Sequence, residues 1–185
     1  MSEKKPMVLV LAGPNGSGKS TFTTHFDTIG QYTNADEITK ATGLDNIAAA
    51  KKADEMRYQS INKGEDFTFE TVLSSEYKMR ILRAAKQKGY FIKCIFILTK
   101  DPDINIERVK SRVEQGGHDV EKKKIKDRYY KSIHNLKELF QICDILHVYD
   151  NTDVPHRLIR KHKEENIIIY PNEHWDADSI LKLIE

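Results

Sequence analysis

One short stretch near the start of the chain limits the fold more than any other part. Residues 13–20, GPNGSGKS, match the pattern Gly-x-x-x-x-Gly-Lys-Ser/Thr at every fixed position. The apolar run MVLVLA, residues 7–12, precedes them and a helix-compatible segment follows. In such a strand–loop–helix unit, backbone N–H groups turn toward phosphate oxygens and the helix N-terminus favours negative charge. The stretch therefore predicts a phosphate-binding loop, and a glycine-rich turn that matches by chance is the weaker interpretation.

The side chains of this loop have expected roles. Lys19 should reach the terminal phosphates of a nucleotide, and the Ser20 hydroxyl can ligate Mg²⁺. The residues expected to contact the nucleotide are Gly13, Pro14, Asn15, Gly16, Ser17, Gly18, Lys19, Ser20 and Thr21.

Short apolar runs alternate with longer amphipathic segments, which is typical of βα units wound into a parallel sheet. The expected strands are residues 7–12, 32–35, 66–71, 91–98, 145–149 and 166–170, and the expected helices are residues 19–26, 46–63, 75–88, 102–114 and 120–143. A hairpin of residues 157–161 and 166–170 and a short helix from Asp176 are expected to end the chain. The pattern predicts an α/β protein of the P-loop NTPase type, with a parallel β-sheet flanked by helices.

Length and composition add further limits. A chain of 185 residues with 39% hydrophobic content can bury one substantial core, so we expect a single domain over residues 1–185. Within it, residues of about 103–130 would form a helical lid, and residues of about 152–185 the hairpin and tail. The net charge of +2 gives no reason to expect nucleic acid or a membrane as partner. The two cysteines, Cys94 and Cys143, lack metal-type spacing and indicate a reducing, cytoplasmic setting.

P-loops serve GTPases, motor ATPases and small-substrate kinases, and the remaining motifs favour a kinase. The string Asn62-Lys63-Gly64-Glu65 differs in its last residue from the base-reading motif of GTPases. The apolar run 91–98 is followed by Thr99 and Lys100, whereas a motor ATPase would place a Mg²⁺-binding carboxylate there.

A kinase needs a carboxylate that takes the proton of the acceptor hydroxyl. Asp36 follows the second expected strand, and ligands of open α/β sheets bind at the carboxyl ends of strands. We therefore expect Asp36 to be the general base and a Mg²⁺ ligand together with Ser20; a helix cap is the alternative. Glu70 and Thr71 end the third strand, where Glu70 could bind acceptor hydroxyls or hold the metal, or could simply be an edge-strand carboxylate.

A kinase also needs cations that neutralise the transferred phosphate. Arg112 and Arg128 flank the pair Gly116-Gly117, which could serve as the joint of a mobile lid. Both arginines are candidate catalytic residues, although charged residues on long helices are usually solvated. His118 could contact adenine or phosphate, or cap a helix.

The motifs LAGPNGSGKST, NADEI, FTFETVLSS, GYFIKCIFILTK, GGHDV and KDRYYKS, in this order, resemble the zeta toxin family of P-loop kinases, in its short stand-alone branch. The resemblance implies a fold like that of nucleotide and shikimate kinases, with ATP and Mg²⁺ as cofactors. It implies that Lys19 and Ser20 bind phosphate and metal, that Asp36 is the catalytic aspartate, and that Glu70 binds the acceptor. It also implies that Arg112 contacts phosphate, with His118 or Arg128 near the place of a second lid residue.

The better-known toxins of this family phosphorylate a UDP-activated N-acetylamino sugar, so the resemblance implies such an acceptor and an antitoxin protein as a partner. A further acceptor-binding carboxylate would be Asp54 or Glu55. However, Val72 and Ser74 stand where those toxins have a threonine and an arginine, so the acceptor can differ. The other hypotheses are a nucleotide-binding interaction module or slow ATPase, and, more weakly, a nucleic-acid end kinase.

Overall fold

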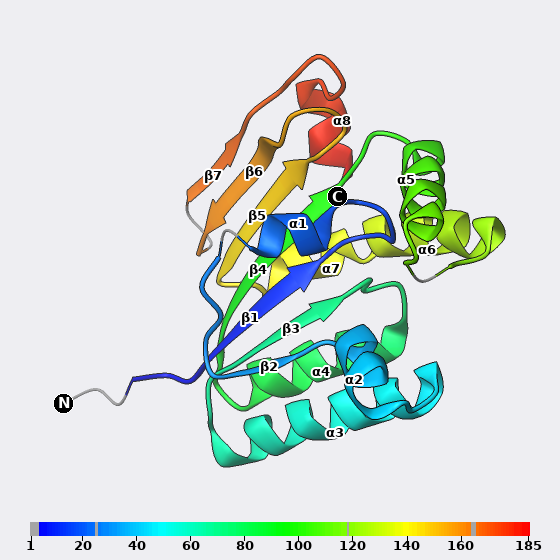
Figure 1. Ribbon diagram of the computed structural model, residues 1–185. Helices are drawn as coiled ribbons and strands as arrows, with labels where there is room; N and C mark the ends of the chain where they lie inside the picture. Colours follow the sequence, from blue (N-terminus) through cyan, green and yellow to red (C-terminus); the bar gives the residue numbers. More distant parts are fainter. Residues whose placement is uncertain (1–3, 25, 118, 164–165) are drawn as a thin grey trace.

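The computed structural model describes residues 4–24, 26–117, 119–163 and 166–185. In this part of the chain, seven strands form one sheet in the order β2-β3-β1-β4-β5-β6-β7 (Figure 1). The strands are β1 (Met7–Ala12), β2 (Gln31–Thr33), β3 (Phe67–Thr71), β4 (Phe91–Leu98), β5 (Ile145–Asp150), β6 (His156–His162) and β7 (Asn166–Ile169). The first five strands pair in parallel, as expected, and the β6–β7 hairpin adds two antiparallel strands at one edge. The sheet is therefore mixed.

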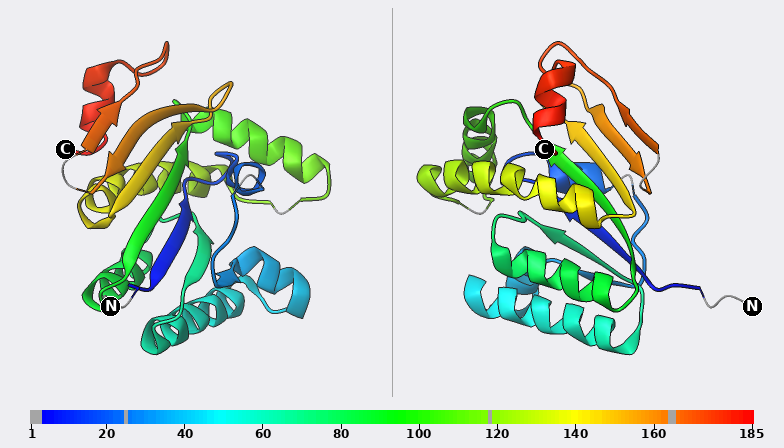
Figure 2. Two further views of the ribbon diagram at one scale, coloured as in Figure 1. Left: turned by 90° about the vertical axis from the view of Figure 1, so that its left-hand side faces the viewer. Right: turned by 180° about the vertical axis from the view of Figure 1, so that it is seen from behind.

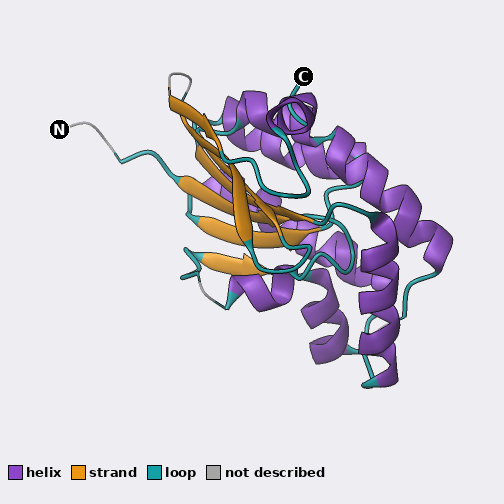
Figure 3. Cartoon of the chain, turned by 90° about the horizontal axis from the view of Figure 1, so that it is seen from above, coloured by secondary structure: helices purple, strands orange, loops and turns teal. Residues whose placement is uncertain are grey.

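Helices cover both faces of the sheet (Figure 2). They are α1 (Lys19–Thr23), α2 (Ala35–Thr42), α3 (Asn46–Lys63), α4 (Glu76–Gln87), α5 (Pro102–Glu114), α6 (Lys122–His134), α7 (Leu136–Ile142) and α8 (Ala177–Lys182). Seen from above, the strands form a single layer with helices on its flanks (Figure 3). No helix within the described ranges has the length and apolar character to cross a bilayer.

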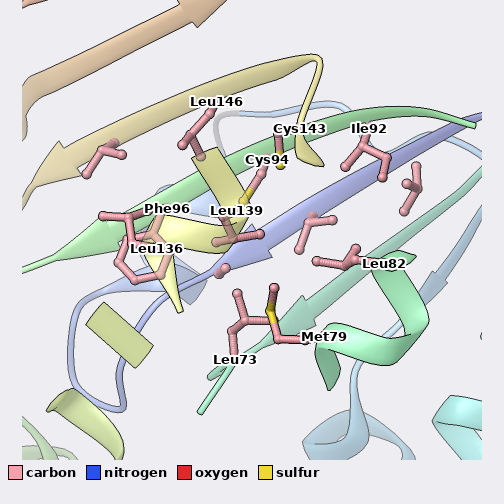
Figure 4. Packing of buried hydrophobic residues seen from close by; sticks show 14 of the residues in the cluster. Leu73, Met79, Leu82, Ile92, Cys94, Phe96, Leu136, Leu139, Cys143 and Leu146 are labelled. Atoms are coloured by element: carbon pink, nitrogen blue, oxygen red, sulfur yellow. The ribbon is translucent and has the colours of Figure 1, made fainter. Parts of the chain in front are cut away.

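Side chains of β1 alternate between two hydrophobic layers, as the period of a strand requires. Val8 and Val10 pack in the larger layer, together with residues of α3, α4, α7 and α8. Figure 4 shows part of this layer, where Cys94 of β4 lies near Cys143, just after α7. Leu9 and Leu11 pack on the opposite face, against Phe22 and Phe26 at α1. The P-loop is therefore held between a strand buried on both faces and a helix that packs against that strand.

Several local expectations differ from the structure. β2 ends at Thr33 rather than residue 35, because the Asn34 side chain accepts a hydrogen bond from the Asp36 N–H and begins α2. The first helix ends at Thr23 instead of residue 26. The helix expected over residues 120–143 is divided at Asn135 into α6 and α7.

Candidate active site

A cavity of about 980 Å³ lies at the carboxyl ends of β1, β2 and β3, where the P-loop meets α2, α4, α5 and α6. Its lining includes Asn15, Gly16, Gly18, Lys19, Ser20, Thr21, Asp36, Glu70, Thr71, Arg112 and Arg128. Eleven residues proposed from motifs far apart in the sequence thus share one cavity.

Close contacts hold the P-loop from two sides. Gly18 has φ 90°, and a Cβ there would lie 2.3 Å from Nδ2 of Asn151, which donates a hydrogen bond to the Ser17 carbonyl at 2.8 Å. Gly16 has φ 75°, and a Cβ there would lie 2.4 Å from the carbonyl oxygen of Asn105 on α5. Glycine is needed at both positions because of the left-handed backbone and because the neighbouring chain leaves no room for a side chain.

Lys19 is 8% exposed, and its ammonium donates hydrogen bonds to the carbonyls of Gly13 and Pro14 at 2.8 and 2.9 Å. Burial lowers the pKa of Lys19 to about 8, while the carboxylates of Glu70 and Asp36 oppose this shift and Arg112 adds to it. Lys19, both carboxylates and Arg112 line the same cavity, where their charges interact.

The loop fits the phosphate end of a nucleotide. The Ser17 hydroxyl is buried and makes no hydrogen bond within the described structure. The Ser20 hydroxyl is exposed to the cavity and lies 3.4 Å from Oε1 of Glu70. Hydroxyl and carboxylate oxygens are the ligands that Mg²⁺ prefers, so Ser20 and Glu70 fit a magnesium ion beside the phosphates.

Asp36 lies in the first turn of α2, is exposed, and lines the cavity. The cap of this helix is Asn34, so the alternative in which Asp36 itself caps the helix is wrong. The Asp36 carboxylate therefore makes no capping hydrogen bond, and Asp36 lines the cavity together with Lys19 and Glu70.

Glu70 is the central carboxylate of the site. Its Oε2 accepts a hydrogen bond from the Tyr32 hydroxyl at 3.4 Å, and the Asn34 amide donates to that hydroxyl at 3.3 Å. Burial raises the pKa of Glu70, which the Lys19 ammonium partly counteracts. Burial likewise raises the pKa of Tyr32 to about 12, so this hydroxyl keeps its proton.

The two glycine-flanking arginines line the cavity, Arg112 from α5 and Arg128 from α6. Nη1 of Arg128 lies 3.4 Å from Oδ1 of Asn15 in the P-loop. Gly116 has φ 84°, and the Gly117 N–H donates to the carbonyl of Arg112, so the glycines turn the chain at the end of α5. His118 lies outside the described residues.

The two carboxylates of α3 are not placed as expected. Glu55 does not line the cavity; it is exposed and lies 3.9 Å from Nζ of Lys52. Asp54 is 3% exposed, and both of its oxygens are bonded to Arg57 or Lys78. Neither carboxylate is open to a direct contact with an acceptor in this structure.

Several residues that hold the site have no signature in the sequence. Asn105 donates to the Asn15 carbonyl at 2.5 Å, and Arg108 donates to the carbonyls of Asn151 and Thr152, each at 2.8 Å. The sequence indicates only polar residues on a helix and after a strand. These contacts depend on tertiary structure.

Residues 72–75, which follow β3, form another part of the cavity wall. Leu73 is 1% exposed and adopts φ 55°, a strained conformation for a leucine. Three hydrogen bonds hold this conformation: the Leu73 N–H donates to the Thr71 hydroxyl, the Asn135 amide donates to the Leu73 carbonyl, and the Ser132 hydroxyl donates to the Val72 carbonyl. We call residues 72–75 the acceptor wall.

The parallel strands, the P-loop between β1 and α1, and the cavity at the strand ends define a P-loop nucleotide-binding protein of the α/β class. Residues 31–173 match the family model described as Zeta toxin. The chain therefore belongs to the zeta toxin family of P-loop kinases, as its motifs predict.

Individual proteins are also similar to this chain. An uncharacterized protein of Haemophilus influenzae is 30% identical over 123 residues, which are 63% of this chain and 88% of that protein. A structure from the PezAT chromosomal toxin-antitoxin system of Streptococcus pneumoniae superposes with a TM-score of 0.58 at 19% identity, over 81% of this chain and 69% of that one. A crystal structure of AvrRxo1-ORF1:-ORF2 with ATP gives a TM-score of 0.71 at 13% identity, over 98% of this chain and 64% of that one. The two structures show that the fold is shared.

Proposed function

We propose that this protein is an ATP-dependent kinase that transfers the γ-phosphate to a hydroxyl group of a small molecule. The observation that carries the proposal is the shared cavity, in which Lys19 and Ser20 of a P-loop face Asp36, Glu70 and two arginines. A P-loop alone would account for nucleotide binding. Phosphate transfer to a hydroxyl also requires a base that accepts the hydroxyl proton. Asp36 is a carboxylate in the same cavity that does not cap a helix, so it can serve as that base.

In the proposed reaction, the acceptor oxygen attacks the γ-phosphorus, the bond to the β-phosphate oxygen breaks, and the hydroxyl proton passes to Asp36. Lys19 and the arginines Arg112 and Arg128 stabilise the negative charge on the transferred group. Ser20 and Glu70 would hold Mg²⁺, which neutralises phosphate charge when bound. Residues 103–130, with the joint at Gly116-Gly117, would act as a lid that brings the arginines to the phosphates.

The acceptor is a small molecule that fits against the acceptor wall and Glu70. A UDP-activated amino sugar is the first candidate because of the family. Because the uncharged Val72 and Ser74 stand where the better-known toxins have a threonine and an arginine, hydroxy compounds other than UDP-sugars are candidates as well.

The test is transfer of labelled phosphate from Mg-ATP to a panel of UDP-sugars, sugars and nucleosides, followed by mass spectrometry of a metabolite extract treated in the same way. At least one product should gain a phosphate. Asp36→Asn should abolish transfer while ATP still binds, and Asp45→Asn, which changes a capping carboxylate outside the cavity, serves as the matched control. Transfer by Asp36→Asn at the wild-type rate would remove Asp36 from the mechanism, and ATP hydrolysis without any phosphorylated product would favour the slow-ATPase alternative.

We also infer a protein partner that controls the site. The Streptococcus pneumoniae relative comes from a toxin-antitoxin system, and the AvrRxo1 structures contain two proteins, ORF1 and ORF2. Both support an antitoxin-like partner for this chain. Co-expression with the product of an adjacent gene, followed by co-purification with and without ATP, tests the inference; no co-purification under either condition would count against it.

A further inference from the structure

A cluster of three charges lies beside the acceptor wall and has no role in the proposed reaction. We call Asp54 and Arg57 of α3 and Lys78 of α4 the Asp54 cluster. Nη1 of Arg57 donates to Oδ1 of Asp54 at 2.8 Å, and Nζ of Lys78 lies 2.6 Å from each carboxylate oxygen. Two cations therefore share one carboxylate.

Arg57 has a complete structural role within the cluster. It is 2% exposed, its Nε donates to the Thr33 hydroxyl at 2.9 Å, and its Nη2 donates to the Thr33 carbonyl at 3.3 Å. Its guanidinium lies 4.5 Å from the centre of the Phe69 ring. Arg57 thus joins α3 to β2 and β3, and the Arg57–Asp54 pair is electrically neutral by itself.

Lys78 is the additional charge. A buried carboxylate needs one cation to offset its charge, and Arg57 already supplies it, so Lys78 leaves the cluster with a net charge of about +1. The Lys78 side chain is 19% exposed and lines the cavity together with residues 72–75. The Tyr77 ring lies 5.6 Å from Nζ. The ammonium is thus fixed by Asp54 on one side while the residue borders the cavity on the other.

The acceptor wall contributes no charge of its own, because it consists of Val72, Leu73, Ser74 and Ser75. On this side of the cavity Lys78 is the cation that α4 contributes, and Asp54 limits the positions that its long side chain can adopt. A pre-positioned ammonium on a residue that lines a cavity is suited to bind a phosphate or carboxylate, because little side-chain entropy is lost on binding.

We propose that Lys78 is a specificity-determining residue that binds an anionic group of the acceptor, and that Asp54 is the positioning residue that holds it. The proposal rests on the proposed kinase function and narrows the acceptor to compounds that carry a phosphate or carboxylate apart from the reacting hydroxyl. Neutral sugars and nucleosides would be poor acceptors.

The first experiment measures anion binding without any phosphate transfer. Inorganic phosphate is titrated into protein saturated with Mg²⁺ and a non-hydrolysable ATP analogue, and NMR follows the signals of Lys78 and its neighbours. We expect a saturable shift at Lys78. Lys78→Gln should weaken phosphate binding at least tenfold, whereas Lys78→Arg and the α4 control Lys86→Gln should stay within threefold of the wild type. Unchanged binding by Lys78→Gln, or no saturable shift at Lys78, would overturn the proposal.

A second variant distinguishes anion binding by Lys78 from a role in which Lys78 only neutralises Asp54. The double variant Asp54→Asn/Lys78→Gln removes the carboxylate together with the cation but leaves the buried Arg57 without its counter-charge, so its unfolding midpoint should lie below that of Lys78→Gln, in which the neutral Arg57–Asp54 pair remains. Its phosphate affinity should remain at least tenfold below the wild type; recovery of wild-type affinity would mean that Lys78 acts only on Asp54. Since neither binding experiment requires a phosphorylated product, both remain informative if the kinase proposal fails.

Discussion

Lys19 is buried among groups of both charge signs, and this environment determines how nucleotide affinity depends on pH. Its lowered pKa, about 8, means that a large part of the ammonium is lost in the nucleotide-free protein between about pH 8 and 10. A bound triphosphate favours the charged form, so binding in this range should take up a proton.

We therefore predict that ATP affinity falls as the pH rises above about 8, by at most about tenfold per pH unit. Calorimetry at pH 8.5 in two buffers with different ionisation enthalpies should show proton uptake by the wild type. In Lys19→Met the remaining binding should be weak and independent of pH in this range. Proton release, or no proton exchange, in the wild type would contradict the assignment of this pKa.

Gly18 and Gly43 allow a second prediction, because both have positive φ but differ in their surroundings. A Cβ at Gly18 would strike the Asn151 amide, whereas nothing lies within 4 Å of a Cβ at Gly43. Gly43→Ala should cost about 1 kcal/mol of unfolding free energy from backbone strain alone. Gly18→Ala should cost about 2–3 kcal/mol, since it also displaces the Asn151 hydrogen bond, and should abolish ATP binding. Urea unfolding and ATP titration measure both effects, and equal costs for the two variants would refute the steric explanation.

At the scale of single residues, the motif predicted the phosphate loop because its chemistry is encoded in consecutive positions. Arg57 and Lys78 were not predicted, since in the sequence they are ordinary charged positions on amphipathic helices. Their partners are Thr33 and Asp54, and these four residues come together only when β2, α3 and α4 pack.

At the scale of elements, β1 and β4 have the predicted bounds and β3 begins one residue later than predicted, because each is a short apolar run between polar breaks. The helix α2 was missed because it is short, none of its residues is buried, and Ile38 is its one large apolar side chain. The break between α6 and α7 was missed for the opposite reason. Buried residues continue across it, from Ile125 and Tyr129 to Leu136 and Leu139.

Asn135 lies between α6 and α7 and donates a hydrogen bond to the acceptor wall. Asn135→Ala removes the donor to the Leu73 carbonyl, and Leu73 is buried in a strained conformation. We expect a loss of about 1–2 kcal/mol of unfolding free energy and a raised KM for the acceptor, with the KM for ATP unchanged. The exposed neighbour Lys137→Ala is the control and should stay within about 0.5 kcal/mol of the wild type. A change in the KM for ATP alone would show that Asn135 acts on the nucleotide side.

At the scale of the whole molecule, the cavity lies between the P-loop, which is part of the sheet core, and two helices that stand beside the sheet. The P-loop follows β1, which pairs with both β3 and β4, whereas α5 and α6 stand beside the sheet (Figure 1). Asn105 of α5 and Arg128 of α6 each form a hydrogen bond with Asn15 of the P-loop. If Arg112 and Arg128 contact the nucleotide as proposed, its stabilising effect should concentrate on these two helices.

We accordingly predict that Mg-ATP analogues slow amide hydrogen exchange in residues 102–134 more than in the β6–β7 hairpin, which lies at the far edge of the sheet and does not line the cavity. At about 100 times Kd the nucleotide should also raise the unfolding free energy by about 2.7 kcal/mol, and Lys19→Met should lose both effects. The difference between the two regions is the decisive measurement, because any tight ligand raises global stability. If protection rises equally in the hairpin and in α5 and α6, the two helices do not close on the nucleotide, and Arg112 and Arg128 would have to reach the phosphates from the positions they already occupy.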